Sequence, residues 1–216
     1  MIEFLDRELN ITGIPDYPGA MNGLQIETMG EIQRVGAAVD ASLPVFEKAV
    51  ADDIDLLIVH HGMFWQGAQK ITGAMYRKLK LAMDSGMALY SAHIPLDIHP
   101  LYGNNKLLAD ALGMTETEAF FDWKGILLGL RQVMDVELET LRDRLATAVG
   151  GPVHVCAGGP EKVGMVGVIT GGAGSEVSAM AEAGIDTFIT GEGPHWSYPL
   201  AEELGVNVLY GGHYAT

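Results

Sequence analysis

The sequence has a single cysteine, few basic residues and no long apolar run, and each shortage excludes a class of protein. Cys156, being alone, excludes an intramolecular disulfide and a cysteine-cluster metal site. No apolar run reaches the roughly 20 residues of a membrane helix, and the N-terminus MIEFLDRELN is acidic where a signal peptide is basic. Neither a G-x-S-x-G nucleophile elbow nor an H-E-x-x-H zinc motif is present. We therefore expect a cytoplasmic protein without a membrane partner.

Basic residues are also outnumbered by acidic ones, 13 against 28, so that the net charge is −15. Such a surface repels phosphate backbones, and no basic stripe offsets it. We therefore expect a small-molecule partner and no nucleic acid. An acidic balance also suits a protein that collects divalent cations.

Apolar residues and glycines are plentiful, and their order along the chain indicates the fold class. Apolar runs alternate with segments of helical periodicity. Strands are expected at 35–39, 56–59, 88–92, 126–133, 153–157, 163–169, 187–190 and 206–210. Helical segments are expected at 1–10, 43–52, 75–85, 106–112, 136–149, 175–183 and 198–204. Because the strands are apolar throughout, we predict an α/β fold with two lobes of mainly parallel sheet flanked by helices.

A domain boundary is expected where polar and aromatic residues interrupt this alternation, at 115–123. Residues 1–120, joined by about 206–216, are expected to form the first α/β lobe. Residues 121–205 are expected to form the second.

Polar side chains gather where four of the expected strands end. The residues that follow these ends, directly or within a few positions, are His60 and His61, His93 and Asp97, Glu192 and His195, and His213. Parallel α/β sheets bind their ligands in the crevice at the carboxyl ends of the strands. We therefore treat these side chains as candidates for a functional site.

Imidazole and carboxylate together suit zinc, manganese, iron, cobalt or nickel. Adjacent residues at a strand end point in diverging directions, so His60 and His61 would serve two neighbouring ions more naturally than one. Asp97 could join one ion and His213 the other. In two-metal hydrolases the ions lie about 3.5–4 Å apart and clamp the attacking and leaving oxygens.

Other polar and aromatic residues have simpler explanations. We expect His99 and His154 to be hydrogen-bonded core histidines. The glycine-rich segment 171–174 could cradle a phosphate, and a tight turn explains it equally well. Phe64 and Trp65 could wall a pocket, although core packing is the expected role.

Seven short strings follow one another along nearly the whole chain. They are NGLQ (22–25), HHG (60–62), HIPLD (93–97), GNN (103–105), GAG (172–174), TGE (190–192) and GHYAT (212–216). Each is weak alone, but the seven in this order resemble the Nif-three-like family, whose bacterial members are often labelled GTP cyclohydrolase I type 2 homologs. The resemblance implies two α/β lobes, a toroidal homohexamer and a dinuclear metal centre that faces the inner cavity.

The same resemblance assigns the metal ligands, most of them in the first expected lobe: His60, His61, Asp97 and His213. It implies two divalent metal ions as cofactors. In the family pattern, GHYAT is followed by a glutamate that bridges both metals and by a C-terminal helix. This sequence stops at Thr216, and we expect it to be truncated there.

Three further residues take roles from the resemblance. His93 matches a histidine that lies beside the metals and supports the ligands. Glu192 and His195 match a motif that approaches the metals, so they are the catalytic candidates for substrate contact or proton transfer. The expected function is a metal-dependent hydrolase of a small phosphorylated or nucleotide-like substrate. The alternatives are a non-catalytic, metal-binding regulatory or metal-handling hexamer, and an interaction scaffold.

Overall fold

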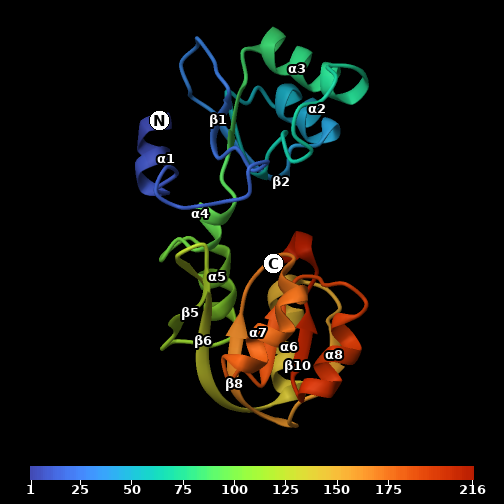
Figure 1. The fold of residues 1–216 in the computed structure, drawn as a ribbon. Coiled ribbons are helices and arrows are strands. Elements are labelled where there is room, and N and C mark those ends of the chain that lie inside the picture. Colours follow the sequence, from blue (N-terminus) through green and yellow to red (C-terminus); the bar gives the residue numbers. More distant parts are fainter. The chain divides into compact units, whose positions relative to one another are not determined.

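The computed structural model describes residues 1–216, which divide into two compact units, Met1–Leu96 and Asp97–Thr216. Each unit is a β-sheet flanked by helices, drawn from blue to green for the first unit and from green to red for the second (Figure 1). The predicted α/β fold with two lobes is therefore confirmed. None of the helices combines the length and the apolar character needed to cross a membrane.

The first unit has a four-stranded sheet in the order β1-β4-β3-β2. Its strands are β1 (Gly23–Ile26), β2 (Val35–Asp40), β3 (Leu56–His61) and β4 (Ala88–Ser91). The last three pair in parallel, and β1 is added antiparallel to β4. The helices are α1 (Ile2–Glu8), α2 (Leu43–Ala51) and α3 (Gly73–Ser85), and the short α4 (Ile94–Asp97) follows β4.

Alternate residues of β3 and β4 are buried in two separate clusters, as expected for a sheet covered on both faces. The cluster under α2 and α3 includes Leu57, Val59, Leu89, Phe46 and Ala82. The cluster under α1 includes Leu56, Ala88, Tyr90, Ile2 and Leu5. Tyr90 of β4 also donates a hydrogen bond of 2.8 Å to Asp6 of α1. This double burial explains why both strands are continuous apolar runs.

The second unit has a six-stranded sheet in the order β5-β6-β8-β9-β10-β7. Its strands are β5 (Glu118–Trp123), β6 (Ile126–Glu137), β7 (His154–Ala157), β8 (Lys162–Val168), β9 (Thr187–Thr190) and β10 (Asn207–Tyr210). β8, β9 and β10 pair in parallel, while β5, β6 and β7 add antiparallel pairs on either side. The helices are α5 (Asn104–Ala111), α6 (Leu138–Val149), α7 (Val177–Glu182) and α8 (Ser197–Leu204), with 3-10 turns η1 (Ala173–Glu176) and η2 (His213–Ala215).

The core of this sheet is again double. One cluster joins α5 and α6 to the sheet and includes Leu112, Leu141, Leu145, Val168, Ile189 and Leu209. The other joins α7 and α8 to it and includes Val177, Met180, Ala201, Phe188 and Val208. Neighbouring residues of β9 and β10 thus enter opposite clusters, as the pleat of a strand requires.

The division into units differs from the predicted boundary in two respects. It falls between Leu96 and Asp97, and residues 206–216 belong to the second unit. β10 lies in the second sheet because it pairs in parallel with β9 through the short connection that contains α8. The polar and aromatic segment 115–123 marks no boundary, since most of it forms β5, an edge strand antiparallel to β6.

The two histidines expected in the core differ from each other. His99 is buried, and its Nδ1 accepts hydrogen bonds from the backbone N–H groups of Leu101 (3.2 Å) and Tyr102 (3.1 Å). His154 is exposed on β7, where its ring lies 5.5 Å from that of Tyr198. The prediction is confirmed for His99 and wrong for His154, because β7 is an edge strand and alternate side chains of an edge strand face solvent.

Asn105 of α5 ties this helix to β6 and to the segment that follows β8. Its side chain is buried, with Nδ2 donating to the Leu128 carbonyl (2.7 Å). Its Oδ1 accepts from the backbone N–H of Thr170 (2.8 Å) and from the Thr170 hydroxyl (3.0 Å). Asn105 therefore fixes the segment that follows β8.

Replacing Asn105 with alanine should destabilise the protein by about 2–3 kcal/mol, because the buried N–H of Thr170 and the partly buried carbonyl of Leu128 lose their partner. Lys106→Ala is the matched control on the same helix. It removes only an ion pair with Asp110, and we expect a change of about 0.5 kcal/mol or less. Urea unfolding measures both variants. Equal unfolding midpoints would show that Asn105 does not hold the helix to the sheet.

Candidate metal centre

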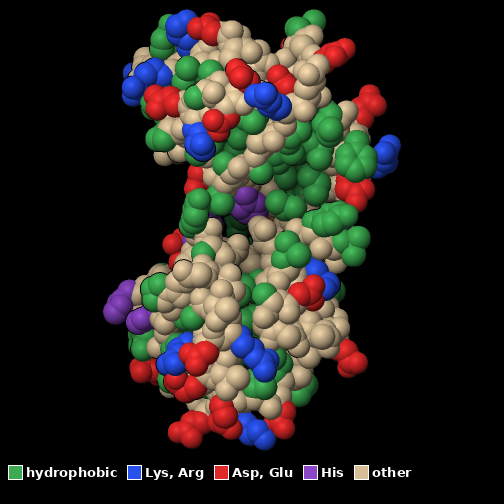
Figure 2. Space-filling view, turned by 180° about the vertical axis from the view of Figure 1, so that it is seen from behind, with side chains coloured by type: hydrophobic (Ala, Val, Ile, Leu, Met, Phe, Trp, Pro, Cys, Tyr) green, Lys and Arg blue, Asp and Glu red, His purple; other side chains and the backbone are tan.

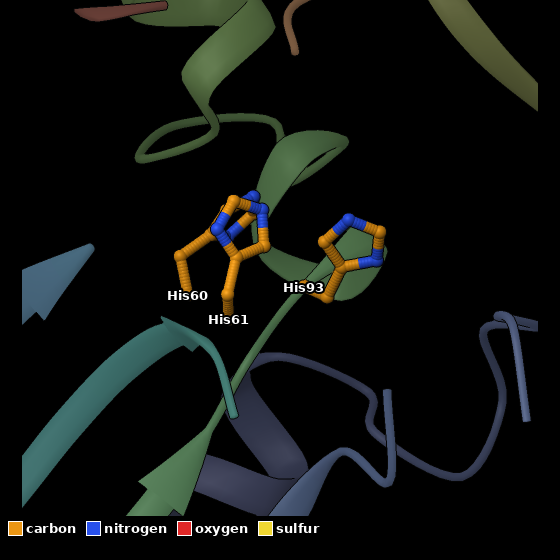
Figure 3. A group of neighbouring side chains, drawn as sticks. All are labelled: His60, His61 and His93. Atoms are coloured by element: carbon orange, nitrogen blue, oxygen red, sulfur yellow. The ribbon is translucent and has the colours of Figure 1, made fainter. Parts of the chain in front are cut away.

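Three histidines meet at one edge of the first sheet. His60 and His61 end β3, and His93 follows β4 closely. Because β3 and β4 are parallel neighbours, their carboxyl ends lie at the same edge. The ring centroids are 4.7 Å apart for His60 and His61, 4.9 Å for His60 and His93, and 5.6 Å for His61 and His93. One ligand atom from each ring lies within 4.8 Å of the others, so the triad could hold a metal ion (Figure 3).

The Nδ1 atom of each ring faces an oxygen atom of the protein. The three hydrogen bonds, each 2.9 Å long, join His60 Nδ1 to the Ala92 carbonyl, His61 Nδ1 to Asp40 Oδ1 and His93 Nδ1 to Asp16 Oδ1. A carbonyl or an ionised carboxylate only accepts, so the proton of each neutral ring lies on Nδ1 and Nε2 keeps its lone pair. This tautomer offers Nε2 to a metal, with an oxygen behind the ring to orient it.

Asp16 is the more enclosed of the two carboxylate partners, with its side chain 7% exposed against 52% for Asp40. It accepts hydrogen bonds from His93, from Asn22 Nδ2 (2.7 Å) and from the backbone N–H groups of Tyr17 (2.6 Å) and Ile94 (3.0 Å). Burial alone would raise the pKa of Asp16, but the hydrogen bonds and the charge of His93 hold that pKa below its usual value. Asn22 Oδ1 in turn accepts from the His93 N–H (2.8 Å). An ionised carboxylate is therefore fixed behind His93.

His61 is favoured in its neutral form. Burial lowers its pKa, and the neighbouring His60 and His93 act in the same direction, while the hydrogen bond to Asp40 opposes them. Neutral imidazole is the form that ligates a metal. At neutral pH His61 therefore has no proton on Nε2 for a metal to displace.

Gln25 clamps the turn that carries the histidine pair. Its Oε1 accepts from the Met63 N–H (2.9 Å), and its Nε2 donates to the carbonyls of Ala20 (3.1 Å) and Met21 (3.0 Å). A Cβ at Gly62 would lie 2.3 Å from Gln25 Nε2, so a larger residue there would displace the Gln25 amide from these hydrogen bonds. Two residues of the NGLQ string thus support the triad. Asn22 holds the backbone at His93, and Gln25 holds the turn that follows His61.

Asp97, a predicted ligand, lies in the second unit at the end of α4. Its Oδ1 accepts from Asn104 Nδ2 (2.8 Å) and lies 3.5 Å from the Thr170 hydroxyl. The carboxylate is thereby held at the start of α5, beside the segment that follows β8. These contacts are also those of an aspartate that caps a turn, so a part for Asp97 as a metal ligand stays a prediction.

His213 and Glu192 come together in the second unit. They follow β10 and β9, which are parallel neighbours, and His213 Nδ1 donates to Glu192 Oε1 at 2.9 Å. His213 thus repeats the arrangement of the triad, with an oxygen behind Nδ1. His195 lies in the exposed turn before α8, and its ring makes no hydrogen bond to either residue. A part for Glu192 and His195 in substrate contact or proton transfer stays a prediction.

The glycine-rich segment 171–174 forms a tight turn beside this pair. Its amides donate within the protein: Gly171 to the Thr216 hydroxyl (3.1 Å), Ala173 to the Thr190 hydroxyl (3.2 Å) and Gly174 to the Glu192 carbonyl (3.0 Å). Three of its four amides are therefore occupied. This favours the turn over the phosphate cradle.

Sequence patterns identify the histidines but miss Asp16 and Asp40. Asp16 lies between two prolines in an irregular loop, where aspartate is a common turn residue, so nothing local marks it. Asp40 does leave a signal, because it ends β2, the parallel neighbour of the strand that ends in His61.

Comparison with known proteins identifies the family of the chain. A family model for Duf34/NIF3 (NGG1p interacting factor 3) matches residues 1–216. A Deinococcus radiodurans protein named GTP cyclohydrolase 1 type 2 homolog is 38% identical over 218 residues, covering 100% of this chain and 82% of its own length.

Solved structures give the same answer. The protein TTHA1606 from Thermus thermophilus is 36% identical with a TM-score of 0.87, over 100% of this chain and 86% of its own. The protein ybgI, described as of unknown function, is 34% identical with a TM-score of 0.89, over 99% of this chain and 85% of its own. Since the family match spans the whole sequence and the relatives agree in sequence and in fold, the chain belongs to the Duf34/NIF3 family.

Proposed function

We propose that this protein binds divalent metal and acts as a metal-dependent hydrolase on a small phosphorylated or nucleotide-like substrate. The observation that carries the proposal is the triad of His60, His61 and His93, in which every Nδ1 is bonded to an oxygen. The name shared by the relatives from Deinococcus radiodurans and Archaeoglobus fulgidus, GTP cyclohydrolase 1 type 2 homolog, contains a nucleotide and supports the substrate class.

The donors of the triad fit a borderline divalent cation. Three imidazoles with carboxylates nearby and no thiolate suit zinc, manganese, iron, cobalt or nickel. Such an ion, when bound, supplies Lewis acidity and lowers the pKa of a coordinated water. The chain keeps His61 and His93 in the correct tautomer, because Asp40 and Asp16 accept hydrogen bonds from the Nδ1 atoms of these rings.

A finer proposal is that the chain holds two ions. Its ligands would be His60 and His61 of the first unit and Asp97 and His213 of the second. The hydrogen bond from His213 Nδ1 to Glu192, which repeats the arrangement of the triad, supports it. Glu192, with its side chain 65% exposed, is then the proton-transfer candidate next to a ligand.

Assembly into a homohexamer belongs to the same proposal and rests on the family resemblance. Light scattering of the purified protein tests it, with a mass of six chains expected. A monomer or a dimer at micromolar concentration would contradict it.

The double variant His60→Ala, His61→Ala should lose its stoichiometric metal, because two of the three imidazoles of the triad are removed. Elemental analysis of the purified protein measures the metal, and circular dichroism checks that the fold is intact. His154→Ala removes an exposed histidine of the second unit and serves as the control. Full metal content in the double variant would refute the assignment.

The variant Asp16→Asn should bind metal about 10–100-fold more weakly. The substitution replaces the ionised carboxylate that accepts the hydrogen bond from His93 Nδ1 by a neutral amide, which orients the ring less firmly. Asp55→Asn is the matched control. Asp55 lies in the same unit and accepts hydrogen bonds from the backbone of Gln33 (2.9 Å) and Arg34 (2.7 Å), but it touches no histidine. Competition with a chromogenic chelator gives both affinities. Equal affinities in the two variants would rule out a role for Asp16.

Turnover is tested by offering the metal-loaded protein a panel of phosphoesters and nucleoside triphosphates. We expect hydrolysis of at least one of them, lost on chelation, restored by the metal and absent in the double histidine variant. Metal at full occupancy without turnover of any compound would contradict the hydrolase. It would favour the alternative, a metal-binding regulatory or metal-handling protein.

A further inference from the structure

Two aromatic side chains adjoin the histidine triad. The Trp65 ring lies 4.7 Å from that of His93 and 5.9 Å from that of His61, nearly perpendicular to both. The Tyr17 ring lies 6.3 Å from His93 and 6.4 Å from Trp65, tilted by 55° to the latter. The triad therefore has an aromatic corner on one side.

This corner is not part of the hydrophobic core. Phe64, the neighbour of Trp65, packs against the cluster under α2 and α3, as the sequence predicts. Trp65 belongs to no core cluster and is 36% exposed, and Tyr17 is 50% exposed. By contrast, Phe46 and Tyr90 in the same unit are fully buried. Apolar surface left in contact with water beside a polar site indicates a surface that a ligand covers.

The loop before β1 holds both rings in place. Gly19 packs so closely on the Trp65 backbone that a Cβ there would lie 2.8 Å from the Trp65 carbonyl oxygen. Tyr17 is anchored through its N–H, which donates to Asp16, the carboxylate behind His93. The loop that orients a histidine of the triad thus also positions the corner, so little ordering remains to be done when a ligand binds.

The chemistry of the corner selects a class of ligand. Aromatic side chains bind flat conjugated rings by stacking on a face or by contact with an edge, and the tilted pair offers both contacts. A bare sugar phosphate gains nothing from such a surface, and the net charge of −15 gives phosphate no general attraction. Recognition at this corner therefore requires a ligand that carries a flat conjugated ring.

We propose that Trp65 and Tyr17 form a stacking subsite for the planar heteroaromatic ring of the substrate, of the size of a nucleobase. The proposal rests on the proposed function, since it names the class of compound that the metal centre would act on. Trp65 binds the ring and Tyr17 closes the corner at its edge. The reacting group then lies beside the imidazoles.

The test compares two probes that differ only by the base, guanosine 5′-monophosphate and ribose 5-phosphate, by calorimetric titration of metal-loaded protein. We expect the nucleotide to bind at least tenfold more tightly. Trp65→Leu should weaken nucleotide binding about 5- to 100-fold, as removal of one base stack does, and leave the sugar phosphate unchanged. Trp65→Phe, which keeps an aromatic face, should restore most of the affinity.

The control is Trp123→Leu, which removes a tryptophan of the β5–β6 hairpin in the second unit and should bind both probes like the unaltered protein. Equal binding of the two probes by the unaltered protein would overturn the subsite. So would a Trp65→Leu variant within twofold of it. A titration of metal-free protein separates the stacking subsite from the proposed metal-dependent hydrolase, because Trp65 and Tyr17 can stack on a base without a bound metal. A preference for the base that persists without bound metal supports the subsite even if the metal assignment fails.

Discussion

The hydrogen bond between a histidine Nδ1 and an oxygen behind it decides which nitrogen each ring offers to a ligand. At His60 the oxygen is a main-chain carbonyl, and at His61 and His93 it belongs to Asp40 and Asp16. Without these partners the rings could turn or change tautomer, and a cluster of three imidazoles would present no common set of lone pairs. The loop before β1, the turn after β3 and the exposed aromatic corner are all arranged around these contacts.

Parallel pairing brings the same arrangement about in both units. β3 and β4 deliver the triad to one sheet edge, and β9 and β10 deliver Glu192 and His213 to another. His60, His61 and His213 are each oriented by an oxygen at or just after the end of a neighbouring strand. His93 is oriented by Asp16 of the loop before β1. Figure 2 shows apolar side chains gathered in a patch on the surface of the first unit, among scattered charged side chains.

Much of this was predictable from the sequence, because apolar runs mark buried parallel strands and the histidines stand directly after them. The antiparallel strands β1 and β5 were not predicted, since one is short and the other contains aspartate and glutamate at an edge. The role of Asp16 was hidden for another reason. It acts on His93, 77 residues away, and only the folded loop joins them. Trp65 lies beside Phe64 in the sequence, and composition cannot tell which of the two enters the core.

The most direct test of the tautomer assignment is a long-range ¹H–¹⁵N correlation spectrum of the histidine rings, recorded on metal-free protein at neutral pH. It reports which ring nitrogen carries the proton. We predict protonated Nδ1 and unprotonated Nε2 for His60, His61 and His93, with the pattern of His93 disturbed when Asp16 is changed to asparagine. Protonated Nε2 in these three rings would contradict the assignment, because the lone pairs would then point away from the metal.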